Sequence, residues 1–110
     1  MNPIEEQKSI ISQLCEIMYL SVDGEYEVMN CRFDYSKSRD GSSSLGAEFW
    51  YELHGHSVSK ALVYPERKKL SKLIPELHSL MNKHTGGNWS CFVISIDEKG
   101  KATTKFEYSL

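Results

Sequence analysis

The sequence is poor in the features that mark membrane proteins and disulfide-stabilised secreted proteins. Within its 110 residues, no apolar run approaches the roughly 18–20 residues that span a bilayer. Residues 1–6 lack the basic and apolar regions of a signal peptide, so we expect a cytoplasmic protein. The three cysteines, Cys15, Cys31 and Cys91, cannot all pair and form no Cys-x-x-Cys motif. Each lies in an apolar pattern, which favours buried, reduced thiols over redox or metal-binding roles.

Signatures of catalysis and of cofactor binding are also missing. Residues 85–88 are glycine-rich but lack the lysine and the following helix of a phosphate-binding loop. No nucleophile elbow or Cys-His-Asp arrangement occurs. His54 and His56 flank Gly55 and share the strand parity of Glu52, yet metal sites usually need three or four organised ligands. We therefore expect no metal, no cofactor and no enzymatic activity, with a small enzyme using these two histidines and the glutamate as an alternative.

The charge is distributed unevenly along the chain. Residues 1–57 carry ten acidic and four basic side chains, whereas residues 58–110 carry five acidic and nine basic ones. The overall net charge of −2 argues against direct nucleic-acid binding, since such proteins are normally basic. The uneven distribution predicts an acidic surface and a separate basic one. A basic cluster, Arg67, Lys68, Lys69 and Lys72, favours a solvated helix face, and a nucleic-acid-binding adaptor using this helix is the second alternative.

Two segments have the spacing of amphipathic helices. Residues 3–20 follow a capping Asn2, and Pro3 suits a first helical turn. The second helical segment covers residues 66–83, where Pro75 predicts either a kink or a break into two helices. The apolar residues at helical spacing are Ile4, Ile10, Ile11, Leu14, Ile17 and Met18 in the first segment, and Leu70, Leu73, Ile74, Leu77, Leu80 and Met81 in the second.

Five segments are typical of strands. Residues 25–35, 45–53 and 57–64 follow the first helix, with an exposed loop over residues 36–44. Residues 88–96 and 101–108 form a C-terminal hairpin around the turn at residues 97–100. The order is therefore α-β-β-β-α-β-β in a single domain, residues 1–110. We predict an α+β fold with one five-stranded antiparallel sheet and helices packed on one of its faces.

The second of these strands has an unusual polar side. Strand alternation places Glu48, Trp50 and Glu52 on one face, opposite Phe49 and Tyr51. A large aromatic residue between carboxylates on an open sheet face is typical of a binding hot spot. A structural role is equally open, in which the tryptophan packs under a loop or against Val28 and Lys60 of neighbouring strands.

The order of elements and several short motifs resemble those of the YezG-like immunity proteins over nearly the whole chain. The matching features are the N-terminal amphipathic helix, the strand end Phe33-Asp34-Tyr35, the aromatic-acidic second strand, the helix over residues 70–81, and the hairpin Trp89…Gly100…Phe106-Glu107-Tyr108. The resemblance implies an antitoxin that binds a toxin domain, often a nuclease, of a polymorphic or contact-dependent growth inhibition system. No catalytic residues come with this family.

We therefore expect an immunity protein that neutralises a cognate toxin domain by stoichiometric protein–protein binding, with a nuclease as the expected toxin. Acidic groups would meet a basic toxin surface, and a buried aromatic anchor would slow dissociation. Neither a membrane nor a nucleic acid is an expected direct partner, and the sequence does not determine the oligomeric state. The predicted toxin interface comprises Glu48, Trp50 and Glu52 on the second strand, and Lys37, Arg39 and Asp40 in the loop expected beside it.

Overall fold

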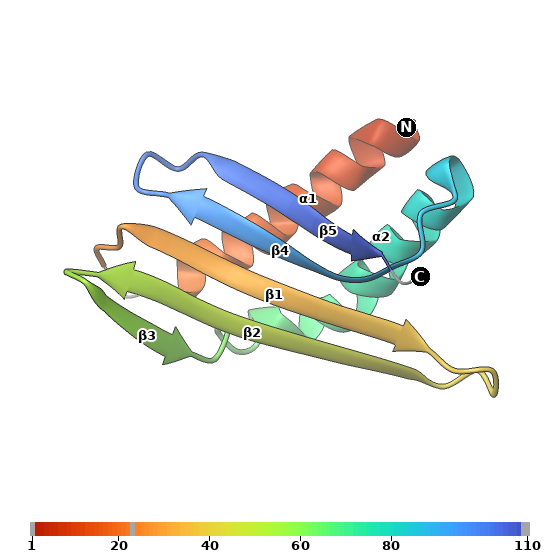
Figure 1. The fold of residues 1–110 in the computed structure, drawn as a ribbon, viewed down its shortest axis with the longest axis horizontal. Coiled ribbons are helices and arrows are strands. Elements are labelled where there is room, and N and C mark those ends of the chain that lie inside the picture. The colour runs from red at the N-terminus through yellow and green to blue at the C-terminus, as the bar shows by residue number, and fades with distance from the viewer. Residues whose placement is uncertain (1, 23, 109–110) are drawn as a thin grey trace.

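The architecture is a five-stranded antiparallel sheet with two α-helices behind it (Figure 1). The computed structural model describes residues 2–22 and 24–108. In this part of the chain the order of helices and strands is the predicted α-β-β-β-α-β-β, which confirms the α+β fold class. The elements are α1 (Pro3–Ser21), β1 (Val28–Lys37), β2 (Ser43–Leu53), β3 (His56–Lys60), the 3₁₀ helix η1 (Glu66–Lys69), α2 (Leu70–Thr85), β4 (Trp89–Asp97) and β5 (Ala102–Tyr108).

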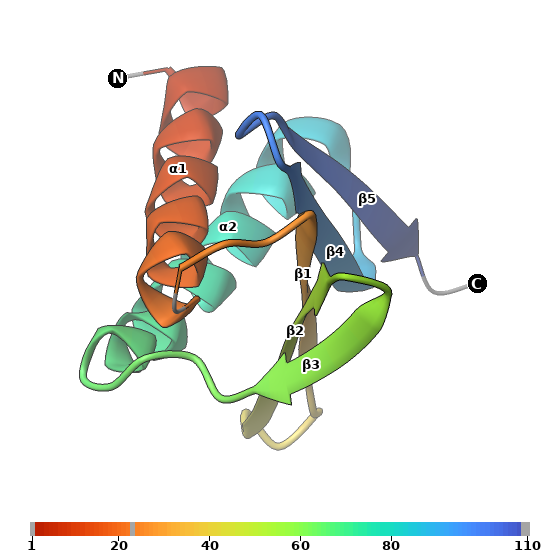
Figure 2. The ribbon, with the colours of Figure 1, turned by 90° about the vertical axis from the view of Figure 1, so that its left-hand side faces the viewer.

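The sheet has the strand order β3-β2-β1-β4-β5, with β1 in its centre. Every neighbouring pair is antiparallel. Both α-helices pack on the same face, and within residues 2–22 and 24–108 the opposite face carries no helix (Figure 2). Alternation along β1 matches this arrangement, because its buried residues are those on the helix side: Met29, Cys31, Phe33 and Tyr35.

The core lies between the helices and this covered face. An aromatic cluster fills its centre, with ring centroids 5.0 Å apart for Phe33 and Phe92 and 4.9 Å apart for Phe92 and Phe106. Trp89 packs edge-on against Phe92 and is only 1% exposed, so it is a structural residue. Tyr108 ends the same hairpin but is 53% exposed, because the edge strand β5 leaves this end uncovered.

The helix ends follow the expected signals. The Asn2 side-chain oxygen accepts a hydrogen bond from the Glu5 backbone N–H at 2.9 Å and caps α1. Gly86 ends α2 in the left-handed conformation, with φ of 73°. A break of the second helix near Pro75 is wrong, since α2 continues through this residue and the change to a 3₁₀ helix occurs earlier, at residues 66–69. None of the helices in the described part of the chain combines the length and apolar character that crossing a membrane requires.

The third strand is shorter than predicted. It ends at Lys60 instead of continuing to residue 64, because Leu62 turns into the core. The Val63 backbone N–H then donates a hydrogen bond to the buried Ser21 hydroxyl at 2.8 Å. The first hairpin is correspondingly longer than predicted, since β1 and β2 remain paired up to Lys37 and Ser43. Only residues 38–42 form its loop.

Candidate interaction surface

The face of the sheet away from the helices, called here the open face, carries the predicted binding residues of β2. The strand register places Trp50 between Asn30 of β1 and Ser59 of β3. Glu48 and Glu52 lie two residues away on either side, on the same face. The strand register therefore places these three side chains on one face, as predicted. Trp50 itself is partly buried, so it combines contact with the sheet and access to solvent.

The structure changes the alternative explanation of Trp50. Lys60 pairs with Phe49, whose side chain lies in the core, so Lys60 has the parity of the helix side and not that of the tryptophan. Val28 does share the open face, diagonally across from Trp50, because Asn30 is the direct partner of the tryptophan. The register therefore does not favour packing against a lysine stem on β3, and the direct neighbours of Trp50 on adjacent strands are a serine and an asparagine.

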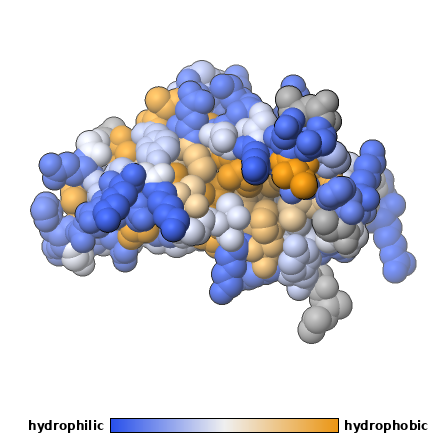
Figure 3. All heavy atoms as spheres, turned by 90° about the horizontal axis from the view of Figure 1, so that it is seen from above, coloured by the Kyte–Doolittle hydropathy of each residue, from blue (hydrophilic) through white to orange (hydrophobic). Residues whose placement is uncertain are grey.

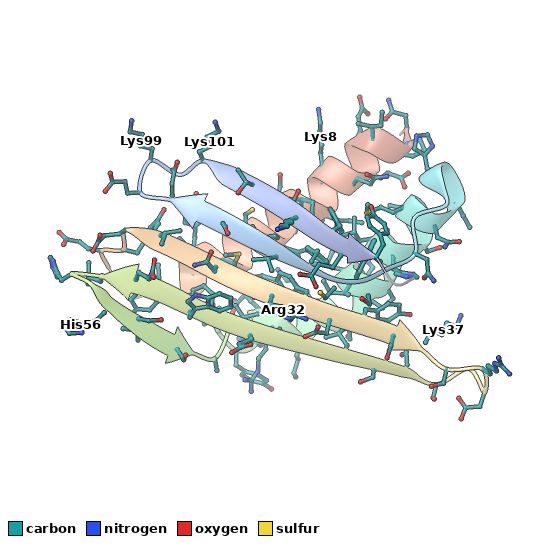
Figure 4. The ribbon with its side chains drawn as sticks, viewed as in Figure 1. Lys8, Arg32, Lys37, His56, Lys99 and Lys101 are labelled. Atoms are coloured by element: carbon teal, nitrogen blue, oxygen red, sulfur yellow. The ribbon has the colours of Figure 1, made fainter. Side chains whose placement is uncertain are left out.

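Arg32 occupies the middle of the open face and organises its charges (Figure 4). Its Nε atom lies 3.3 Å from Asp34 Oδ1, and its Nη1 atom lies 3.9 Å from Glu107 Oε2. The register also sets Glu48 directly opposite on β2. These groups are substantially solvent-exposed, so the ion pairs add little stability and leave the side chains available for a partner.

A thiol completes this polar cluster. Cys91 is buried between β1 and β5, and its Sγ atom donates a hydrogen bond to Glu107 Oε2 at 2.9 Å. Burial, reinforced by this hydrogen bond to the glutamate, raises the pKa of the Cys91 thiol to about 11. The group is thus a neutral thiol near pH 7, as is Cys31 in the core, whose pKa burial also raises. Of the three free cysteines, Cys31 and Cys91 are buried as expected, whereas Cys15 is only partly buried.

The open face is acidic where the strands are longest. Among the side chains that project from this face on β1, β2 and β5, carboxylates outnumber cations. One of the cations, Arg32, already contacts two of the carboxylates. The register aligns β5 with the same rows, setting Lys105 opposite Val93. The charged side chains with this parity on β1, β2 and β5 are Asp34, Glu48, Glu52 and Glu107, against Arg32 and Lys105.

The loop residues of the predicted interface do not lie beside Trp50, which corrects the sequence-based expectation. Regular pairing continues from the pair Arg32 and Glu48 to the pair Lys37 and Ser43. At about 3.3 Å per residue, the hairpin tip lies roughly 17 Å farther along β2 than Glu48, on the side away from Trp50. Lys37 also has the parity of the helix side. Arg39 and Asp40 belong to the tip, where the Asp40 carboxylate accepts hydrogen bonds from the hydroxyl (2.7 Å) and backbone N–H (3.0 Å) of Ser42. These hydrogen bonds lower the pKa of Asp40.

The two histidines do not form a site with Glu52. Leu53 pairs with His56, so His54 and Gly55 make a two-residue hairpin loop with φ values of 51° and 76°. His56 has the parity of Leu53, which places it on the opposite face from Glu52. The His54 backbone N–H donates to the Glu27 carboxylate. Among the described residues there is no group of three or more histidine, cysteine or acidic side chains that could hold a metal ion.

Sequence reasoning missed the part of the site that comes from the other strands. Strand alternation places Arg32 and Asp34 on the polar side of β1, but this pattern by itself gives them no role. Their proximity to Glu107 depends on β4 inserting between β1 and β5. A charged residue in the middle of a strand was the available signal, although a single sequence does not say which strands become neighbours.

Two of the grooves away from the open face lie against strands of the sheet. One, of about 600 Å³, lies between β2 and the segment before α2, and its lining includes Leu45, Ala47, Arg67 and Lys68. The other, of about 480 Å³, lies between α1, α2 and β5. Figure 3 views the molecule from above and shows hydrophobic residues gathered in the middle, bordered by hydrophilic ones. The hydrophobic residues that line this second groove are Ile4, Ile11, Leu77, Met81, Ala102 and Phe106.

The fold and the site together define a small α+β domain with one helix-covered and one open, acidic sheet face. No protein-family model matches the chain. The chain is similar to a protein of Stenotrophomonas maltophilia described as "Chorionicgonadotropic hormone-like protein", with 35% identity over 80 residues. This similarity covers 73% of the chain but only 18% of that relative, so the chain spans less than a fifth of the relative's length. It does not assign the chain to a family.

Proposed function

We propose that this domain is an immunity protein that neutralises a toxin domain by binding it through the open face of the sheet. The observation that carries the proposal is the position of Trp50, partly buried between Glu48 and Glu52 on a face that no helix covers. The sequence resemblance to YezG-like immunity proteins supplies the toxin as partner, and the acidic face fits a basic surface such as that of a nuclease. The proposal includes a cytoplasmic location.

Two physical effects would act together in such a complex. Carboxylates on the open face attract a basic partner over distances of about a Debye length and speed its association. Trp50 then supplies a rigid aromatic anchor whose burial slows dissociation. Arg32 can exchange its exposed carboxylate partners for groups of the toxin, because its present ion pairs are solvent-screened.

The alternative of a small enzyme receives no support from the geometry. His54 lies in a hairpin loop, and His56 and Glu52 have opposite strand parity, so the three groups do not converge on one substrate position. General acid–base catalysis requires such groups within hydrogen-bond reach of the reacting atoms.

The test is co-purification with the toxin domain encoded in the same locus, followed by affinity measurements on variants. Trp50→Ala should weaken binding by about 2 kcal/mol or more. Glu48→Gln combined with Glu52→Gln should mainly slow association and flatten its salt dependence. The matched control is Tyr108→Ala, an exposed aromatic of different strand parity on β5, which should leave the affinity unchanged. Folded variants that bind and protect like the wild type would exclude the open face as the interface.

A further inference from the structure

The strand β2 has an unpaired edge at its beginning. It pairs with β1 over residues 43–52, whereas β3 covers its other side only from Phe49 to Leu53. Figure 1 shows β2 running past the end of β3 as the lower edge of the sheet. Residues 43–48 therefore have a strand partner on one side only, and all of them except Gly46 are exposed. Six residues at about 3.3 Å each give an open edge of roughly 20 Å.

This edge lacks most of the usual protection against strand pairing. Natural edges are commonly blocked by proline, lysine or a β-bulge. Residues 43–48 read Ser-Ser-Leu-Gly-Ala-Glu, and their pairing with β1 is regular. The one charge, on Glu48, projects from the open face and not along the edge. An extended peptide could thus bond to the free backbone groups of this segment.

An apolar groove continues the sheet on the helix side of this edge. Leu45 and Ala47 pair with the buried residues Tyr35 and Phe33, so their side chains project toward the helices. Both lie beyond the part of β2 that β3 covers, and together with Ala61 and other residues they line the groove of about 600 Å³. Leu45 is 36% exposed. A large apolar side chain is thus left open to solvent beside the unpaired backbone edge. The remaining lining residues are Leu62, Leu70, Ser71, Arg67 and Lys68.

The charges of the groove are of one sign. Arg67 and Lys68 line it, and none of the described residues in its lining is a carboxylate. Both cations stand over the ring of Tyr64, with the guanidinium carbon 5.4 Å and the ammonium nitrogen 4.9 Å from the ring centroid. In the groove between the two helices, by contrast, Lys69 and Lys72 are accompanied by Glu6 and Glu76.

We propose that the free edge of β2 and its groove bind an extended acidic segment of a partner protein by strand addition. Every second side chain of the added strand would face the groove. Apolar side chains at these positions would cover Leu45 and Ala47, and carboxylates would meet Arg67 and Lys68. The opposite side chains would extend the open face. The groove of this site lies on the opposite side of the sheet from Trp50, and Glu48 is the residue that the edge segment shares with the proposed toxin interface.

The probe for this site is a capped seven-residue peptide with glutamate at positions one and seven, valine at three and five, and threonine elsewhere. Its symmetry serves either strand direction. We expect a dissociation constant below about 1 mM by NMR titration, with amide shifts and slowed hydrogen exchange concentrated at residues 43–48. Shifts located elsewhere, or no binding at this concentration, would overturn the proposal.

Matched changes separate the charge and backbone contributions. Arg67→Glu with Lys68→Glu should weaken binding at least tenfold, whereas Lys99→Glu with Lys101→Glu, on the distant hairpin seen in Figure 4, should change it less than twofold. Replacing both glutamates of the peptide by lysine should likewise weaken its binding to the wild-type protein at least tenfold. One further peptide is N-methylated at its threonines and another at its valines. Alternate amides of the added strand face β2, so at least one of these two peptides should bind tenfold more weakly than the unmethylated peptide. Equal binding by all peptides would overturn strand addition.

Other occupants give distinct outcomes. Trp50→Ala should leave peptide binding unchanged, so a failure of the toxin hypothesis does not affect this test. Sedimentation that shows a dimer of the wild type, abolished by Ala47→Glu, would overturn the proposal in favour of a second copy of the chain. Binding of a short single-stranded RNA at this site in place of the peptide would overturn it in favour of a nucleic acid. Melting curves of all variants should match that of the wild type.

Discussion

The two faces of one strand show how differently this domain uses neighbouring residues. Phe92 and Val93 are adjacent on β4, but Phe92 is fully buried under the helices, whereas Val93 lies on the open face beside Arg32. The covered face is apolar and aromatic, and its side chains hold the helices to the sheet. The open face is polar, acidic and solvent-accessible, and little of the fold depends on it. The side chains that hold the helices thus lie on one side of the sheet, and the proposed binding surface lies on the other.

The largest expected effect is on the covered face. Phe92→Ala should lower the free energy of unfolding by about 3–5 kcal/mol, because it removes a buried ring that packs against Phe33, Trp89 and Phe106. Val93→Ala, one residue away, should cost about 1 kcal/mol or less. Urea unfolding followed by circular dichroism measures both. Equal losses would contradict the distinction between the two faces.

A smaller effect is expected at the edge of the same aromatic cluster. Phe106 stacks on Phe92 but is only partly buried, since β5 is an edge strand. Phe106→Ala should therefore cost about 2 kcal/mol, less than the roughly 3–5 kcal/mol of a fully buried phenylalanine. Thermal melting compared with Phe92→Ala tests the order. A Phe106 variant that melts like the wild type would show that β5 is peripheral to the core.

On the open face, removing Arg32 should barely affect stability. Its contacts with Asp34 and Glu107 are exposed ion pairs, which contribute about 0–1 kcal/mol. Arg32→Met should change the unfolding free energy by less than about 1 kcal/mol at moderate salt. A loss of 3 kcal/mol or more would mean that the charge cluster is structural, and would weaken the comparison between the faces.

The smallest expected effect is a change in the pH dependence of stability at alkaline pH. Burial raises the pKa of Cys91 from 9.0 to about 11, so the unfolded state loses this proton first. The thiol's contribution is fully present below pH 9 and is lost as the pH rises toward 11. Cys91→Ala should therefore show a shallower fall of stability over this interval than the wild type. Parallel curves in urea titrations at pH 8 to 11 would refute the assignment.

Much of the fold could be predicted from local patterns. The spacing of Leu14, Ile17 and Met18 defined α1, and alternation from Met29 to Tyr35 defined the buried side of β1. The order of elements and the covering of one sheet face follow from such patterns, because each amphipathic element must bury its apolar side. Element ends were less predictable: β3 stops at Lys60 because the core takes up Leu62, a tertiary contact that no local pattern specifies.

The candidate site divides in the same way. Strand alternation alone predicts that Glu48, Trp50 and Glu52 share a face, since it depends only on covalent geometry. The meeting of Arg32, Cys91 and Glu107, the distance of Lys37 to Asp40 from Trp50, and the extension of β2 past β3 appear only in the folded sheet. Strand register and neighbour order are set when the whole sheet packs against the helices, and distant parts of the chain determine this packing together.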